Sequence, residues 1–149
     1  MNSTLKNTHS LKLKRLGIDT HQEPVVYMRA DCPVCRSEGL EAQARIQVTT
    51  ECHQIIATMN VVHDHLVAPD EAGLSEIAWK LLNPKEGQQA TFTHPPPVDS
   101  FRHVRSKIYG HTLSADDFHE VIHDVVDGRF TDIQLASLIT ACAATGLNV

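Results

Sequence analysis

Residues 93–100 read Thr-His-Pro-Pro-Pro-Val-Asp-Ser (THPPPVDS), and the pattern of the chain changes on either side of them. Consecutive prolines cannot donate backbone hydrogen bonds and they stiffen the chain, which is typical of a boundary between domains. Apolar residues alternate as in strands before this stretch and recur at helical spacing after it. We therefore expect an α+β protein, with a small β-barrel domain over residues 11–94, a proline-rich linker over 95–100 and a helical segment over 101–149.

Upstream of the prolines, strand-like runs alternate with short helical ones. Strands are predicted at 11–18, with a bulge near Arg15 or Gly17, and at 24–28, 45–48, 54–62 and 89–94. Asp31 is the predicted N-cap of a short helix over 32–38, and Ser75 that of a helix over 76–82. The two strand–helix–strand passages are of similar size. They favour a pseudo-twofold closed barrel, because closure removes exposed strand edges.

Downstream of the prolines, the sequence predicts three amphipathic helices. They begin at Asp99 or Ser100, at Ser114, and at Thr131, where Gln134 has the spacing of a capping box. The apolar stripes are expected to hold Phe101, Val104 and Ile108; then Phe118, Val121, Ile122, Val125 and Val126; then Leu135, Leu138, Ile139 and Cys142. Three helices cannot bury these apolar faces by themselves. We therefore expect a further helix after Val149 and a truncated bundle.

Bulk composition narrows the classes of function. The formal net charge is -5 at pH 7 with both signs mixed along the chain, which argues against a nucleic-acid surface. No apolar run has the length of a membrane span, and residues 1–10 are polar and patternless, so we expect a disordered arm and no membrane partner. Four cysteines without a secretory signal predict free thiols in a reducing cytoplasm.

The run His119-Glu120-Val121-Ile122-His123 fits the H-E-x-x-H signature of zinc proteases. In that chemistry two histidines one helical turn apart bind zinc, and the glutamate activates a water. The extended signature would need Gly and His at the positions of Val126 and Arg129, and no Glu follows as a third ligand. The predicted apolar stripe leaves both histidines on its polar flank, so we expect surface histidines here.

The run Cys32-Pro33-Val34-Cys35 is a C-x-x-C pair, which could be half of a zinc site or a redox pair. A structural zinc site needs four ligands, and the sequence has no second C-x-x-C. The residues that could complete such a site, Cys52, His53, His63 and His65, have the spacing of no standard zinc finger. We expect two thiols on a short capped helix, one or both buried, and no bound metal.

The helical segment resembles a known family. Ser106-Lys107-Ile108-Tyr109-Gly110, Leu113-Ser114, Val126-Asp127-Gly128 and Thr131-Asp132-Ile133-Gln134 follow one another. This order is similar to the N-terminal helices of the nucleoside phosphorylase and anthranilate phosphoribosyltransferase group. Upstream, Gly73-Leu74-Ser75 and Glu86-Gly87 resemble the N-terminal extension of AMP phosphorylase and of the bacterial thymidine phosphorylase-like proteins. That extension is similar to a double-psi β-barrel.

The resemblance implies an enzyme that cleaves a nucleoside with phosphate, releasing the base and a sugar 1-phosphate. Phosphate is then a co-substrate, and no cofactor is expected. The family's catalytic groups match nothing in this chain, whose seven glycines are isolated, so we expect no catalytic residue and no activity of the chain alone. The resemblance also implies a homo-oligomer with interface positions on the first and third helices, here Phe101, Val104, Ile108, Leu135, Leu138 and Ile139.

Three readings of function stay open at this point. The intact protein is expected to act on thymidine or another pyrimidine nucleoside, or else on AMP or another nucleoside monophosphate. The third possibility is a free-standing interaction module that holds a metal through Cys32 and Cys35.

Overall fold

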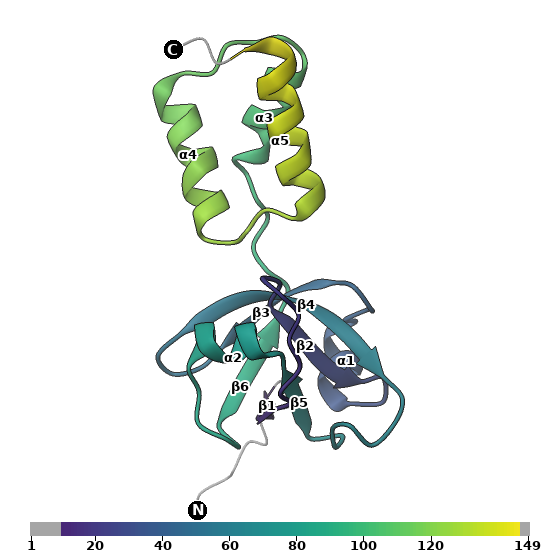
Figure 1. The fold of residues 1–149 in the computed structure, drawn as a ribbon. Coiled ribbons are helices and arrows are strands. Elements are labelled where there is room, and N and C mark those ends of the chain that lie inside the picture. Colours follow the sequence, from purple (N-terminus) through teal and green to yellow (C-terminus); the bar gives the residue numbers. More distant parts are fainter. Residues whose placement is uncertain (1–9, 147–149) are drawn as a thin grey trace, which may run out of the picture. The chain divides into compact units, whose positions relative to one another are not determined.

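The computed structural model describes residues 10–146 and forms two units, residues 1–95 and 96–149 (Figure 1). The boundary between the units falls within the run of three prolines, inside the linker predicted at 95–100. Residues 1–9 of the predicted arm lie outside the described residues. Ser10, which the sequence assigned to that arm, is instead the first residue of a strand, because it pairs with Thr91 of the last strand in the first unit.

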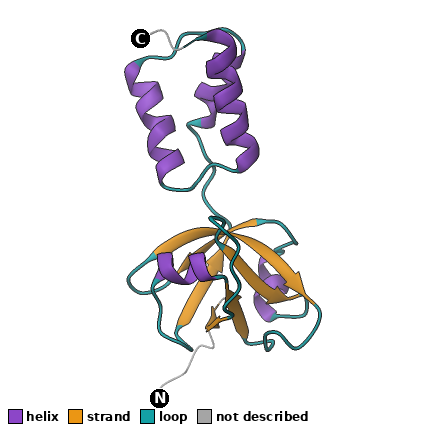
Figure 2. Ribbon diagram, in the orientation of Figure 1, coloured by secondary structure: helices purple, strands orange, loops and turns teal. Residues whose placement is uncertain are grey.

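The first unit contains six strands and two short helices (Figure 2). In chain order these are β1 (Ser10–Arg15), β2 (Val25–Arg29), α1 (Pro33–Glu38), β3 (Arg45–Thr49), β4 (Gln54–Val62), β5 (Glu71–Leu74), α2 (Glu76–Leu82) and β6 (Gln89–Thr93). The strands close into a barrel in the order β1-β5-β2-β4-β3-β6. The predicted barrel is therefore confirmed, and every strand edge in it is paired.

The barrel is pseudo-twofold, as the repeated strand–helix–strand pattern predicted. The β1–β5 and β2–β4 pairs are parallel, and the remaining neighbours are antiparallel. The segment β1-β2-α1-β3 corresponds to the segment β4-β5-α2-β6. When the two segments are exchanged, every pair of neighbouring strands becomes a pair of neighbouring strands of the same barrel, with the same direction. Alternate side chains along the strands point inward and form one core, which includes Leu13, Val26, Met28, Ile46, Val48, Met59, Leu74 and Phe92.

Two local predictions for the barrel are wrong. The strand predicted to run to residue 18 ends at Arg15, and Gly17 lies in the following loop with φ of 69°. Asp31 does not cap α1, because its carboxylate binds the Arg29 guanidinium through two hydrogen bonds of 2.8 Å. The cap is Cys32, whose sulfur accepts a hydrogen bond from the Cys35 N–H.

The second unit contains α3 (Phe101–Ile108), α4 (Ala115–Val126) and α5 (Asp132–Thr145). Ser114 with Asp117 and Thr131 with Gln134 form complete capping boxes at the starts of α4 and α5. The core of this unit joins Val104, Val121, Phe130 and Leu138, with the rings of Phe101 and Phe130 edge to face at 6.0 Å between centroids. α3 packs against both other helices.

The predicted apolar stripes of α4 and α5 are partly wrong. Val121 and Leu138 are buried, but Ile122 is 40%, Val126 78% and Ile139 68% exposed. The helices carry apolar residues around more of their circumference than three helices can cover, so part of each stripe faces outward. Within residues 10–146, none of the helices has the length and apolar character needed to cross a membrane.

Candidate functional site

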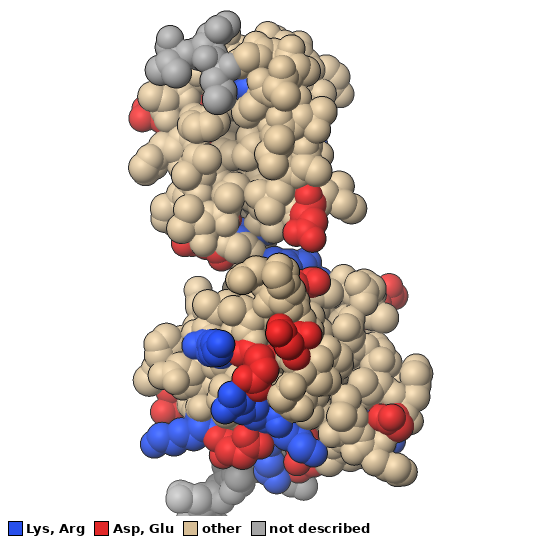
Figure 3. Space-filling model, in the orientation of Figure 1, with Lys and Arg blue, Asp and Glu red and all other residues tan. Residues whose placement is uncertain are grey.

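An exposed apolar face on α3 and α5 is the main surface feature of the helical unit. Ile108 on α3 is 51% exposed, and Ile133 on α5 is 79% exposed. Clusters of large aliphatic side chains exposed to solvent are typical of interaction surfaces. In the view of Figure 3, the helical unit shows few charged side chains, whereas charges of both signs crowd on the barrel unit.

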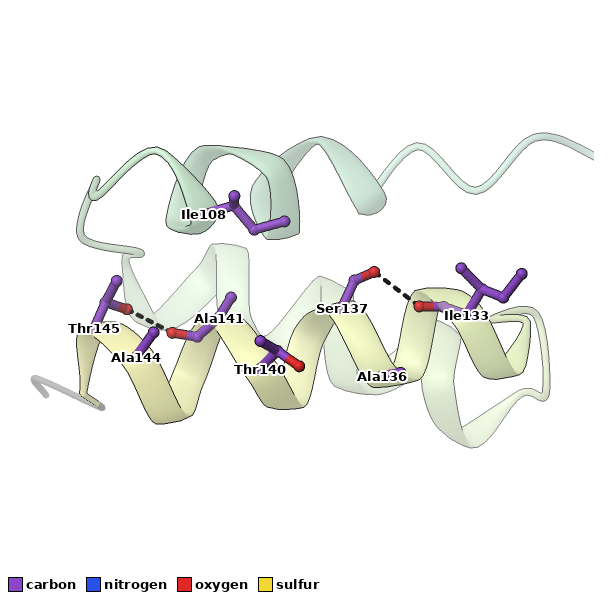
Figure 4. Close-up of a pocket in the computed structure, with 8 residues that line it drawn as sticks. All are labelled: Ile108, Ile133, Ala136, Ser137, Thr140, Ala141, Ala144 and Thr145. Atoms are coloured by element: carbon purple, nitrogen blue, oxygen red, sulfur yellow. Dashed lines mark hydrogen bonds between the residues drawn. The ribbon is translucent and has the colours of Figure 1, made fainter.

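Small side chains separate Ile108 from Ile133 and leave a groove of about 470 Å³ (Figure 4). Ile108 comes from α3 and the rest of the lining comes from α5: Ile133, Ala136, Ser137, Thr140, Ala141, Ala144 and Thr145. Ser137 and Thr145 donate their hydroxyl protons to carbonyls of their own helix, those of Ile133 and Ala141, over 2.8 Å. The groove is therefore apolar in character, and its small residues allow a second helix to approach closely.

The six predicted interface residues are divided by the structure. Val104 and Leu138 are buried in the core of the helical unit, and Phe101 and Leu135 pack against that core while partly exposed. Ile108 lies in the groove, and Ile139 is exposed on α5 outside the groove lining. Their role in a subunit contact stays a prediction.

The sequence interpretation did not select the groove residues of α5. Ile133, Ala136, Thr140 and Ala144 recur at helical spacing, but three of the four are small or polar, so the larger side chains of Leu135, Leu138 and Ile139 dominate the apolar pattern of the helix. The available signal was that α5 is apolar around its whole circumference, from Ile133 through Ala143, which indicates contacts on more than one side.

The H-E-x-x-H run does not form a metal site in this structure. Glu120 faces α3, where its carboxylate lies 3.0 Å from Nε2 of His103 and 3.4 Å from the Arg102 guanidinium. His123 lies 3.3 Å from Asp127 on its own helix. Over residues 10–146 no group of three or more His, Cys, Asp or Glu side chains is arranged to hold a metal ion.

The sulfur atoms of Cys32 and Cys35 lie 2.8 Å apart, and both residues are buried beside Met28. The hydrogen bond between the two thiols, together with backbone N–H donors of α1, lowers the pKa of Cys32 to about 7. The same hydrogen bond, then burial, raises the pKa of Cys35. The two thiols therefore differ in acidity, with Cys32 the more acidic and the more nucleophilic of the pair.

The cations along β1 offer no anion site, because each has a carboxylate partner. Lys12 pairs with Asp70 at 3.0 Å, Lys14 with Glu71 at 3.6 Å and Arg15 with Glu76 at 2.6 Å. A phosphate group would have to displace a carboxylate at each of them.

Comparison with known proteins places these features in context. Residues 102–149 match the family model described as glycosyl transferase family, helical bundle domain. Over 140 residues, 94% of the chain, it is 52% identical to a protein of Polaromonas sp. (strain JS666) named "Putative thymidine phosphorylase". Over 138 residues, 93% of the chain, it is 53% identical to a protein of the same name in Hahella chejuensis. The chain spans 27% of the length of each relative.

Among solved structures, the barrel is similar to the computationally designed msDPBB_sym2 protein, with a TM-score of 0.50 and 16% sequence identity. The match covers 58% of the chain and 96% of the designed protein. This similarity shows the fold alone, and it identifies the closed barrel as a double-psi β-barrel, as the resemblance implied. With a double-psi barrel followed by a glycosyl transferase helical bundle, and with half of its residues shared with these relatives, the chain belongs to the thymidine phosphorylase-like family.

Proposed function

We propose that this chain is the N-terminal part of a thymidine phosphorylase-like pentosyltransferase. The complete protein would cleave the glycosidic bond of a nucleoside with phosphate, giving the free base and a sugar 1-phosphate. The observation that carries the proposal is the 52% identity over 94% of the chain to a relative of that name. The helical bundle match over residues 102–149 agrees with it.

Phosphorolysis requires a cradle for phosphate and a group that stabilises charge on the departing base. The β1 cations are paired with carboxylates, and the α3–α5 groove is apolar, so neither feature supplies such a cradle. Phosphate would therefore bind in parts of the complete enzyme that this chain does not contain. We expect no phosphorolysis by the 149-residue chain, and no cofactor beyond the phosphate co-substrate.

An activity assay tests both statements. The chain and a full-length relative are each incubated with thymidine or with AMP, with and without phosphate, and free base is measured by chromatography. We expect phosphate-dependent release of thymine by the relative and no release by the chain. Release of adenine from AMP would support the nucleotide alternative, and turnover by the chain alone would contradict the assignment of its role.

We propose further that this part serves assembly, with a second copy of the chain as the occupant of the α3–α5 groove. Ile108 and Ile133 stand on either side of small residues, so each copy offers both projecting side chains and a hollow to receive them. Such a surface can pair with itself across a twofold axis. No Lys, Arg, Asp or Glu lines the groove, so two copies that meet there bring no like charges together.

Oligomeric state tests the assembly role. We expect the chain to dimerise in sedimentation equilibrium, and Ile133→Glu to shift it to monomers because a carboxylate would be buried in an apolar contact. Val126→Glu is the matched control, since Val126 is equally exposed but lies on α4 outside the groove. A monomeric unsubstituted chain would indicate that further chain of the longer relatives covers the groove. If Ile133→Glu and Val126→Glu weakened the dimer equally, the groove would be excluded as the dimer contact.

A further inference from the structure

The two halves of the barrel cap their helices with different side chains. α1 and α2 occupy equivalent places in the pseudo-twofold barrel, and each begins after a residue whose side chain caps it. At α2 the hydroxyl of Ser75 accepts the N–H of Ala78 over 3.4 Å. At α1 the sulfur of Cys32 accepts the N–H of Cys35 over 3.2 Å. Capping and packing are thus achieved in one half by Ser and Ala, so neither requires a pair of thiols.

The two thiols lie closer together than side-chain packing alone would bring them. The Sγ atoms of Cys32 and Cys35 are 2.8 Å apart, closer than two sulfurs in ordinary van der Waals contact. Formation of a bond between them needs little movement, because residues three apart at a helix start face each other. Pro33 fixes the backbone between them at the first helical position.

The two thiols also differ in character, as a nucleophile and a resolving thiol must. Hydrogen bonds to the Cys32 sulfur lower its pKa to about 7, so a large fraction is thiolate at neutral pH. Cys35 stays protonated beside it. Within the described residues no third ligand completes a metal site, which removes the main competing use of a C-x-x-C pair.

We propose that Cys32 and Cys35 form a reversible intramolecular disulfide, which makes the first turn of α1 a redox-sensitive element of the barrel. The oxidant is a peroxide. The Cys32 thiolate attacks one peroxide oxygen, the O–O bond breaks, and Cys32 becomes a sulfenic acid with release of hydroxide. The Cys35 sulfur then attacks the Cys32 sulfur, its proton leaves with the departing oxygen as water, and the S–S bond forms. A thiol reductant reverses the reaction.

Access is the remaining requirement. Cys32 is fully buried and Cys35 is 7% exposed. Hydrogen peroxide is among the smallest oxidants, and α1 is a helix of six residues at the surface of the barrel. Short elements of this kind open locally at lower free energy than the strands beneath them. The inference is independent of the proposed enzymatic function, because it depends only on this chain's own barrel.

Mass spectrometry tests the proposal on the full chain. Cys52 and Cys142 are first replaced by serine, since Cys52 is exposed and Cys142 partly so. The protein is treated with equimolar hydrogen peroxide, quenched with catalase and analysed intact and after proteolysis. We expect a loss of two hydrogens, a Cys32–Cys35 linked peptide, and full reversal by dithiothreitol. In the Cys35→Ser variant, which keeps a hydroxyl beside Cys32 but lacks the resolving thiol, a sulfenic acid should accumulate at Cys32 and be trapped by dimedone.

The matched control copies the other half of the barrel. Cys32→Ser with Cys35→Ala reproduces Ser75 and Ala78, and this variant should fold and show no mass change with peroxide. Unchanged mass of the two-thiol protein would overturn the proposal. Cross-links between chains, or a gain of oxygen without an internal disulfide, would overturn it as well. None of these readouts depends on whether the parent protein is a phosphorylase.

Discussion

Arg129 donates from Nη1 to the Asp124 carboxylate over 2.6 Å, linking the turn after α4 back to the helix. Asp124 is buried, and its other oxygen accepts the Ser100 hydroxyl over 2.6 Å. Arg129 also donates from Nη2 to the Pro97 carbonyl over 3.0 Å. One buried carboxylate therefore fixes both the end of α4 and the segment that leads into α3.

Asp124→Ala is expected to destabilise the helical unit by about 3 kcal/mol, because it leaves a largely buried guanidinium without its partner. Urea denaturation followed by far-ultraviolet circular dichroism measures the change. Glu120→Ala is the control on the same helix. It removes the contacts of an exposed carboxylate with Arg102 and His103 and should cost less than about 1 kcal/mol. Equal losses would show that Asp124 is not the anchor described here.

Gly73→Ala is expected to destabilise the barrel by about 1–3 kcal/mol, as overpacking does. A Cβ atom at this position would lie within 3 Å of the Leu16 and Val67 side chains. Trp79 is the only tryptophan and packs against the barrel core, so its fluorescence reports this unit during urea denaturation. The double variant Gly73→Ala with Leu16→Ala should recover part of the loss. If the double variant were no more stable than Gly73→Ala, the clash with Leu16 would not be the cause of the loss.

The strand that contains Gly73 is the part of the barrel that the sequence did not predict. β4 and α2 match their predicted bounds residue for residue, because a run rich in β-branched residues marks the first and the Ser75 cap marks the second. β5 was not predicted at all. Its four residues, Glu71–Leu74, contain no alternation, and they are a strand because β1 and β2 pair with them on either side. Long-range pairing of this kind leaves no local signal.

The candidate site was predictable only in part, for a related reason. The sequence predicted that the three helices carry more apolar surface than they can bury, and the family resemblance implied an interface on the first and third. Neither indicated which residues would remain exposed. Val104 and Ile108 lie on one predicted stripe, yet one is fully buried and the other half exposed. The difference arises because α3 packs against α4 and α5 along only part of its length, which depends on crossing geometry and not on periodicity.

Lys107→Met is expected to destabilise the helical unit by about 1–2 kcal/mol. Lys107 is buried, and its ammonium group donates to the Gly146 carbonyl at the end of α5 over 2.8 Å. Methionine keeps the apolar stem but leaves that carbonyl without its charged donor. Arg105→Met, on the exposed side of the same helix, is the control and should cost less than half as much. Hydrogen exchange of the last turn of α5 should increase only in the Lys107 variant.

The capping box of α4 should make the helical unit sensitive to acid. The Asp117 carboxylate accepts the Ser114 N–H over 3.0 Å, and this backbone hydrogen bond is the main cause that lowers the pKa of Asp117. Because the folded pKa is depressed, the contribution is present above the ordinary pKa near 3.8 and is lost as pH falls through the lower, folded value. Asp117→Asn should therefore reduce stability at neutral pH and flatten the decline in acid.

Ser114→Ala isolates the other half of the same box. It removes the hydroxyl that accepts the Asp117 N–H over 3.1 Å and should cost about 1 kcal/mol. Asp116→Asn is the matched control, since Asp116 lies in the same first turn but outside the capping box. Unfolding of all three variants is measured by circular dichroism between neutral and acidic pH. An Asp116 variant that lost as much acid sensitivity as the Asp117 variant would assign the effect to helix-end charge instead of the cap, because both carboxylates sit at the positive end of α4.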